Sequence, residues 1–177
     1  LYVGLIGVEK ILQLAIQALG HILPKAPNTY LVLAGPGSSI EVAKFRTLAT
    51  KHGAEDNLIF TGILNRSEVM GAFASSNIFV FPSIADTQGL VINEACAQSK
   101  PIVFVDDKIS SLTRNNTNGF HSKNNPRDFA AKCLKLITEP ELQKKFGKAS
   151  HELALGHSGE NQAKKLVDMY QGIVSEN

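Results

Sequence analysis

Short apolar runs, rich in β-branched and aromatic residues, alternate along the chain with longer segments in which apolar residues recur every three or four positions. The short runs predict β-strands and the longer segments predict amphipathic helices. This alternation is typical of a parallel sheet that is covered by helices on both faces. The predicted strands are residues 1–4, 30–34, 58–61, 78–82 and 101–105, with a short edge strand at 119–121. We therefore expect an α/β fold built on a doubly wound parallel sheet.

The helical period predicts helices between these strands at residues 9–23, 40–52, 66–75 and 90–98. After Pro126 the pattern changes, and three further helices are expected at 126–138, 140–155 and 160–174. Pro126 and Pro140 suit first-turn positions, where proline lacks only a hydrogen bond that the helix would not make. We expect this helical C-terminal tail to pack on the sheet as part of the same domain.

Composition narrows the possible functions. The 177 residues suffice for one domain with a proper core, and a net charge of +2 is too small to indicate a nucleic-acid surface. Cys96 and Cys133 fit no metal-ligand spacing and are expected to be buried thiols. The sequence contains no apolar stretch that could span a bilayer and no signal peptide pattern, which indicates a cytoplasmic domain. The opening "LYVG" is already strand-like, so we expect a piece of a longer protein whose upstream part carries some of the function.

The stretch "DTQGLVINEACA" places two acids around a glycine at a predicted strand-to-helix loop. Ligands of doubly wound sheets bind at such loops, beyond the carboxyl ends of the strands. With Gly89 at the helix entrance, the N–H groups of Gly89, Leu90 and Val91 would be available to a phosphate. Asp86 and Glu94 would flank that anion, an arrangement that suits a sugar-nucleotide. The spacing alone is equally compatible with a capping acid and a solvated helix acid.

This stretch resembles the E-x7-E signature of retaining, GT-B-fold nucleotide-sugar glycosyltransferases of family 4 (group 1), usually written E-x-F-G-x-x-x-x-E-A-M-A. Asp86 stands at the first acid, Gly89 at the glycine and Glu94 at the second acid. The segments "YVGLIGVEK", "YLVLAGPG", "NLIFTGILNRSEV" and "NTNGF" resemble further family motifs in the family's order. The resemblance covers nearly the whole chain. It implies the Rossmann-like donor-binding half of such an enzyme, with the N-terminal acceptor domain absent.

The resemblance also implies roles for particular residues. Glu94 would hold the nucleotide ribose, Asp86 would contact hydroxyls of the donor sugar, and Lys10 would pair with the diphosphate; these three are the expected catalytic residues. The other residues expected to line the donor site are Gly4, Gly35, Gly37, Ile63, Leu64, Gln88, Gly89, Leu90 and Val91.

Three positions depart from the family pattern. Asp86 is one methylene shorter than the usual Glu, and Gln88 replaces an aromatic residue. Leu5 stands where the family has an arginine. Since a charge-assisted contact to phosphate contributes about 1.5–3 kcal/mol, this last change would weaken donor binding by about one to two orders of magnitude.

The reaction implied by the resemblance is retaining, metal-independent transfer of a sugar from a nucleoside diphosphate, such as a UDP-sugar, to an acceptor hydroxyl in glycolipid or surface polysaccharide synthesis. "TQGL" and "VDDKI" resemble the subset that glucosylates diacylglycerol in bacterial membranes. The expected partners are the donor, an acceptor lipid or glycan and the missing N-terminal domain, through which the protein would touch the inner face of the membrane. The alternative is a non-catalytic nucleotide-binding or regulatory module, which Leu5 favours.

Other candidate chemistry is weaker. In "AGPGSSI", Ile40 stands where a dinucleotide-binding G-x-G-x-x-G needs its third glycine, which argues against an oxidoreductase cofactor. Asp106 and Asp107 lack the D-x-D form, so no metal site is expected. No G-x-S-x-G motif is present. Surface or structural roles are expected for the five histidines, His21, His52, His121, His151 and His157.

Overall fold

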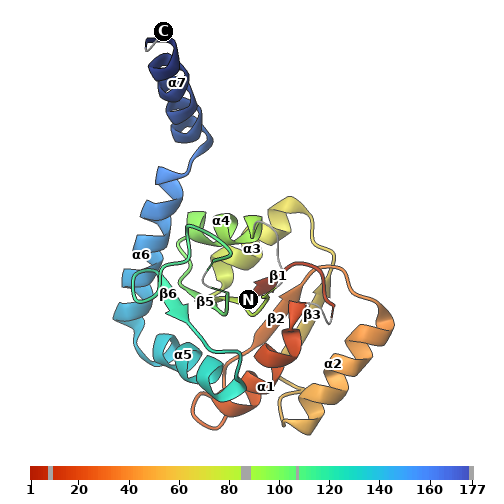
Figure 1. The fold of residues 1–177 in the computed structure, drawn as a ribbon. Helices are drawn as coiled ribbons and strands as arrows, with labels where there is room; N and C mark the ends of the chain where they lie inside the picture. Colours follow the sequence, from red (N-terminus) through yellow and green to blue (C-terminus); the bar gives the residue numbers. More distant parts are fainter. Residues whose placement is uncertain (8–9, 85–88, 107, 176–177) are drawn as a thin grey trace.

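Six parallel strands form the centre of the part of the protein that the structure describes. The computed structural model describes residues 1–7, 10–84, 89–106 and 108–175. One sheet has the order β1 (Tyr2–Val3), β2 (Leu31–Ala34), β3 (Leu58–Gly62), and the other has the order β4 (Phe79–Phe81), β5 (Ile102–Phe104), β6 (Gly119–His121) (Figure 1). Leu1 joins the two sheets, because its nitrogen donates to the Ile78 carbonyl at 2.9 Å and its carbonyl accepts from the Val80 N–H at 2.8 Å. The strands therefore run β3-β2-β1-β4-β5-β6, and the predicted doubly wound parallel sheet is confirmed.

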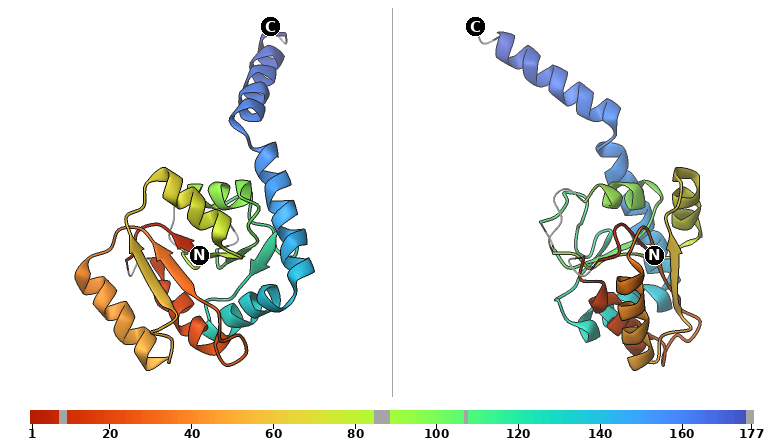
Figure 2. Two further views of the ribbon diagram at one scale, coloured as in Figure 1. Left: turned by 180° about the vertical axis from the view of Figure 1, so that it is seen from behind. Right: turned by 90° about the vertical axis from the view of Figure 1, so that its right-hand side faces the viewer.

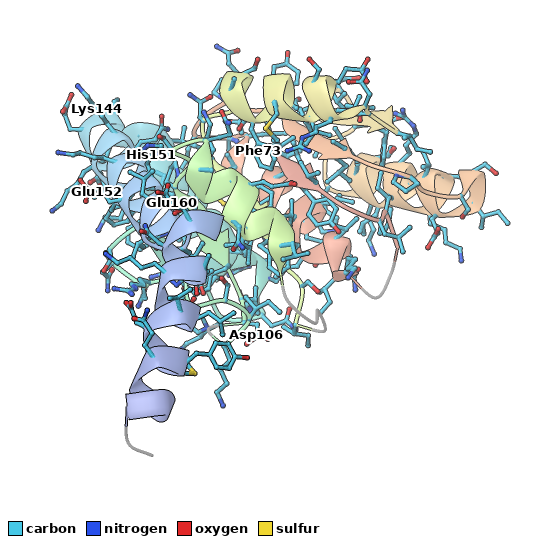
Figure 3. All side chains as sticks on the ribbon, turned by 90° about the horizontal axis from the view of Figure 1, so that it is seen from above. Phe73, Asp106, Lys144, His151, Glu152 and Glu160 are labelled. Carbon is cyan, nitrogen blue, oxygen red and sulfur yellow. The ribbon has the colours of Figure 1, made fainter. Side chains whose placement is uncertain are left out.

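Helices cover both faces of the strands, as predicted (Figures 1 and 2). One face carries α1 (Leu12–Ile22), α2 (Ser39–Lys51) and α5 (Pro126–Thr138), whose apolar residues share a buried cluster with β1, β2 and β3. The other face carries α3 (Arg66–Ser75) and α4 (Leu90–Ala97), which share a second cluster with β4 and β5. Figure 3 looks down on this face, with Phe73 of the second cluster between α3 and α4.

Local sequence accounts for where several helices begin. Ser38 accepts a hydrogen bond from the Glu41 N–H, and the Glu41 side chain bonds back to Ser38, which forms a capping box at the start of α2. Asn65 and Glu68 form the same arrangement at α3. Asn125 caps α5, where Pro126 occupies the first helical position as expected. These caps fix the helix starts that follow the strand loops.

The C-terminal tail divides into a packed part and a projecting part. Helix α6 (Pro140–Gly156) packs against α4 and α5, whereas α7 (Gly159–Ser175) extends away from the body (Figures 1 and 2). The expectation that the whole tail packs on the sheet is therefore wrong for α7. Both sheet faces are already covered, so the apolar side chains of Leu166, Val167, Met169 and Tyr170 remain 50–62% exposed. Among the described residues, no helix is long and apolar enough to cross a membrane.

Candidate functional site

The carboxyl ends of the strands meet at one edge of the molecule because all strand pairs are parallel. The strand order reverses between β1 and β4, and ligands of doubly wound sheets bind beside that switch point. The topology brings most of the sequence-predicted donor residues to this edge: Gly4 and Lys10 after β1, Gly35 and Gly37 after β2, Ile63 and Leu64 after β3, and Gly89, Leu90, Val91 and Glu94 in α4 or at its start. Asp86 and Gln88 fall within 85–88 and lie outside the described residues.

Helix α4 begins at Gly89 in a conformation that favours glycine. Gly89 has φ 54° and ψ 38°, and a Cβ there would lie 2.9 Å from Ile92 Cδ1 and 3.3 Å from Ile109 Cγ1. The Gly89 carbonyl accepts from the Ile92 N–H at 2.7 Å. The N–H groups of Gly89, Leu90 and Val91 lie at the helix start, where the helix itself provides no carbonyl to accept their hydrogen bonds. Together with the helix dipole, they form a place where an anion would be stabilised.

Glu94 lies one turn into α4, on the side that faces solvent. It shares the exposed side with Leu90 and Ala97, at spacings of four and three residues, while Ile92 and Cys96 are buried on the opposite side. Because its carboxylate is exposed and lies near the helix start, it is available to the hydroxyls of a ligand bound there. This position matches the role that the resemblance assigns to Glu94, although a solvated helix acid would lie there too.

The loops after β1 and β2 pack against each other at their glycines, with direct contact between the two backbones. A Cβ on Gly35, whose φ is 144°, would lie 2.0 Å from the Gly4 carbonyl oxygen. A Cβ on Gly37 would lie 2.8 Å from Ile6 Cβ, and the Gly4 N–H donates to the Ala34 carbonyl at 2.9 Å. The close approach of the two loops thus accounts for Gly35 and Gly37. A contact with the donor stays a prediction for them.

Lys10 and Leu5 occupy the loop between β1 and α1. Lys10 lies in the turn that leads into α1, where its N–H donates to the Gly7 carbonyl at 3.2 Å. Leu5 is 48% exposed, and its carbonyl accepts from the Tyr2 hydroxyl at 3.0 Å. The position where the family has an arginine is therefore solvent-accessible but apolar.

The loop after β3 contributes an apolar residue, and the loop after β5 contributes an acid that is hydrogen-bonded within that loop. Ile63 is 78% exposed and Leu64 is half-buried, so Ile63 offers an apolar surface at the site edge. Asp106 Oδ1 accepts from the Lys108 N–H at 2.9 Å, an ordinary loop contact, and Asp107 lies outside the described residues. The parts of the chain that the structure describes contain no group of three His, Cys, Asp or Glu side chains placed to hold a metal ion.

Three of the histidines make structural hydrogen bonds, as expected. The His121 ring bonds to the Val105 carbonyl through Nε2 at 2.8 Å, and the His151 ring bonds to the Ala97 carbonyl through Nδ1 at 2.9 Å. The His157 ring bonds to the Ser111 hydroxyl at 3.1 Å. Sequence reasoning did not single out the buried Asn118, which directly precedes β6. The only available signal was the Asn-Gly pair in "NTNGF".

A cavity of about 610 Å³ lies at the opposite, amino-terminal edge of the strands. Its lining includes Leu1, Tyr30, Ile78 and Cys133 and contains no charged side chain. Burial raises the pKa of the Cys133 thiol to about 12. Because this cavity disfavours charge, it does not suit a diphosphate, and the carboxyl edge remains the candidate site.

The chain is similar to known proteins in both sequence and fold. The sequence profile described as "Glycosyl transferases group 1" matches residues 1–153. The chain is 31% identical to sulfoquinovosyl transferase SQD2 of Arabidopsis thaliana over 86% of its length and 29% of the relative's length. It is 30% identical to alpha-monoglucosyldiacylglycerol synthase of Streptococcus pneumoniae, over 55% of its length and 22% of the relative's length. A variant of S. aureus TarM, solved with fondaparinux, alpha-GlcNAc-glycerol and UDP, shares the fold with a TM-score of 0.81 at 23% identity, over 96% of this chain and 35% of that one.

Proposed function

This chain belongs to the glycosyl transferases group 1 family, and we propose that it forms the donor-binding half of an enzyme that transfers a sugar from a nucleoside diphosphate to an acceptor hydroxyl. The start of α4 carries this proposal. Gly89 leaves backbone N–H groups available there, and Glu94 faces solvent one turn further on. A diphosphate and the hydroxyl groups next to it match these two features.

In the proposed reaction, the bond between the anomeric carbon and the diphosphate oxygen breaks while the acceptor oxygen bonds to the same face of that carbon, with retention. The acceptor proton passes to the departing diphosphate or to solvent. Negative charge grows on the diphosphate, and Lys10 and the α4 N-terminus would stabilise it from positions fixed before the reaction. Asp86 and Glu94 would act by holding the sugar and the ribose, which is catalysis by positioning. We propose that this donor site works without a metal ion.

The whole protein is proposed to contain a second, N-terminal domain that provides the acceptor site. The chain spans 29% and 22% of the lengths of the two relatives named above. The exposed apolar residues of α7, such as Met169 and Tyr170, offer a surface on which such a domain could pack. One relative is named for monoglucosyldiacylglycerol, and we propose a membrane lipid or a surface glycan as the acceptor, reached from the cytoplasmic side.

A non-catalytic nucleotide-binding module is the second candidate, and Leu5 is the observation that favours it. Without the expected arginine, the site would offer a diphosphate less positive charge at an exposed position. Such a module would bind UDP yet show no transfer of sugar from any UDP- or GDP-sugar in the full-length protein. Transfer activity therefore separates the two candidates.

Donor binding is tested by isothermal titration calorimetry of the full-length protein with a panel of UDP- and GDP-sugars. Replacing Glu94 removes a charge-assisted hydrogen bond worth about 1.5–3 kcal/mol, so Glu94→Ala should raise Kd by about 10- to 100-fold. Glu152→Ala is the matched control, because Glu152 is an exposed acid of α6 (Figure 3) and should leave Kd unchanged. Absence of binding across the panel, together with no effect of Glu94→Ala, would end the proposal.

A further inference from the structure

Asn118 is a fully buried polar residue that joins three segments around α4. Its Oδ1 accepts from the Arg114 N–H at 2.9 Å, and its Nδ2 donates to the Leu112 carbonyl at 2.7 Å. Nδ2 also lies 3.2 Å from the Ser150 hydroxyl of α6 and 3.7 Å from the Cys96 sulfur of α4. The carboxamide thus ties the loop that follows β5 to two helices at once.

Helix α6 completes this attachment of α4. The Ser150 hydroxyl donates to the Lys100 carbonyl at 2.7 Å, just beyond the end of α4. The ring of His151 bonds to the Ala97 carbonyl in the last turn of α4 at 2.9 Å, and Figure 3 shows His151 beside that helix. The C-terminal half of α4 is therefore held by named polar contacts, while its N-terminal half faces the candidate site.

The same loop also reaches the start of α4. Ile109 of this loop packs close to Gly89, since a Cβ added to Gly89 would lie 3.3 Å from Ile109 Cγ1. Ile109 and Leu112 also share one buried cluster with Ile92 of α4. Asn118 closes this loop, because its side chain bonds to both Leu112 and Arg114. The residue therefore supports α4 at both ends, through Cys96 at one end and through the loop at the other.

We propose that Asn118 is a positioning residue of the donor site: its buried carboxamide fixes the rotation of α4 and thereby the directions of the Gly89 N–H group and the Glu94 carboxylate. This inference rests on the proposed function, since it assumes that the α4 start binds the donor.

Helix geometry shows why rotation of α4 matters. Cys96 and Glu94 are two residues apart, which places them about 200° apart around the helix axis, so a contact at Cys96 holds the side opposite to Glu94. A rotation of about 10° moves an atom at the helix surface, about 5–6 Å from the axis, by about 1 Å. A shift of about 1 Å is enough to break a hydrogen bond of normal length. The contacts at the buried side of α4 can therefore decide how well the exposed side binds.

Asn118→Asp tests the inference, because the two side chains have nearly the same shape. Near pH 8 the ionised variant cannot donate to the Leu112 carbonyl. We expect its Kd for UDP to rise about 10- to 100-fold over that of the wild-type full-length protein, because a misdirected α4 start loses a charge-assisted hydrogen bond to the nucleotide. Burial raises the pKa of a carboxyl group, so the protonated variant should again donate to Leu112 near pH 5.5. The ratio of the two Kd values should then fall to within about threefold, and protonation of UDP itself cancels in that ratio. The neighbouring Cys96 does not interfere, since burial raises the pKa of its thiol to about 11.

Cys133→Ala is the control, because Cys133 is also buried, at 4% exposed, but lies in the core cluster that contains no residue of α4. It should lower the melting temperature and leave the Kd for UDP unchanged. If Asn118→Asp does not fold near pH 8, Ser150→Ala decides, since it removes one Nδ2 contact and should still weaken UDP binding several-fold. If the folded Asn118→Asp protein binds UDP as tightly as the wild type, the inference about Asn118 is overturned, while the proposed function stands. The same holds for Ser150→Ala where Asn118→Asp does not fold. A wild-type protein that binds no UDP overturns the proposed function as well.

Discussion

Leu5→Arg should restore a cation that the group 1 family usually places beside the diphosphate. The substitution is well tolerated by the structure, because Leu5 is 48% exposed and belongs to neither buried cluster. The Leu5 carbonyl stays bonded to the hydroxyl of Tyr2, a side chain that is 2% exposed, so the loop keeps its course whatever side chain Leu5 carries. We expect a change in unfolding free energy within about 0.5 kcal/mol.

The expected gain in binding follows from charge. A hydrogen bond between a guanidinium and a phosphate contributes about 1.5–3 kcal/mol, and solvent screening at an exposed position favours the lower end. Since about 1.4 kcal/mol corresponds to a factor of ten, Leu5→Arg should lower Kd for UDP by about tenfold. The gain should be smaller for UMP and absent for uridine, because these ligands lack one or both phosphates. It should also shrink as salt is added.

Isothermal titration of UDP, UMP and uridine at low and high salt measures these changes. Tyr30→Arg is the matched control: Tyr30 is 56% exposed but lies at the amino-terminal edge, beside the apolar cavity. It adds the same charge far from the loop of Leu5 and should not tighten UDP binding. An equal gain for uridine, or an equal gain in Tyr30→Arg, would show that Leu5 does not face a bound diphosphate.

Two further predictions concern stability. Gly35→Ala should lower the unfolding free energy by about 3 kcal/mol or more, because its Cβ would overlap the Gly4 carbonyl oxygen, and urea denaturation measures the loss. Gly53→Ala, also at positive φ but with open space around it, should cost only about 1 kcal/mol, and equal losses would contradict the packing argument. The second prediction concerns a polypeptide that begins at Leu1. Burial lowers the pKa of its N-terminal ammonium from 8.0 to about 6, so between pH 6 and pH 8 the unfolded state binds more protons than the folded state. Stability should therefore rise by about 2 kcal/mol from pH 6 to pH 8 and be lost again as the pH falls, and N-acetylation should abolish that rise.

Local pattern was sufficient to predict most of the fold. Strands β2, β4 and β5 appear in the sequence as apolar runs that are too short for helices. The capping residues Ser38 and Asn65 mark the starts of α2 and α3. The weakest of the predicted strands, 119–121, pairs with β5, where Gly119 lets the backbones approach; a Cβ there would lie 1.9 Å from the Ile102 carbonyl. Apolar runs and helix caps depend on neighbouring residues only, which is why a sequence reveals them.

The missed features depend on contacts between distant residues. The spacing of Leu166 and Tyr170 predicts an apolar helix face, but it cannot tell whether any surface of this chain remains to cover that face. Helix α7 extends away from the body, and other helices cover both faces of the sheet. In the same way, Asn118 reads as a turn residue, and its role emerges only where α4, α6 and the loop after β5 meet.

Leu5 and Asn118 are connected through the charge that the proposed reaction creates. With an apolar residue at position 5, less of the charge on the leaving diphosphate can be balanced by side chains, and the N–H groups at the start of α4 would carry a larger share. Hydrogen bonds from backbone groups depend steeply on direction, so the orientation of α4 then matters more than it would beside two cations. The contacts that fix this orientation, centred on Asn118, would therefore be more important in this chain than in a relative that keeps the arginine.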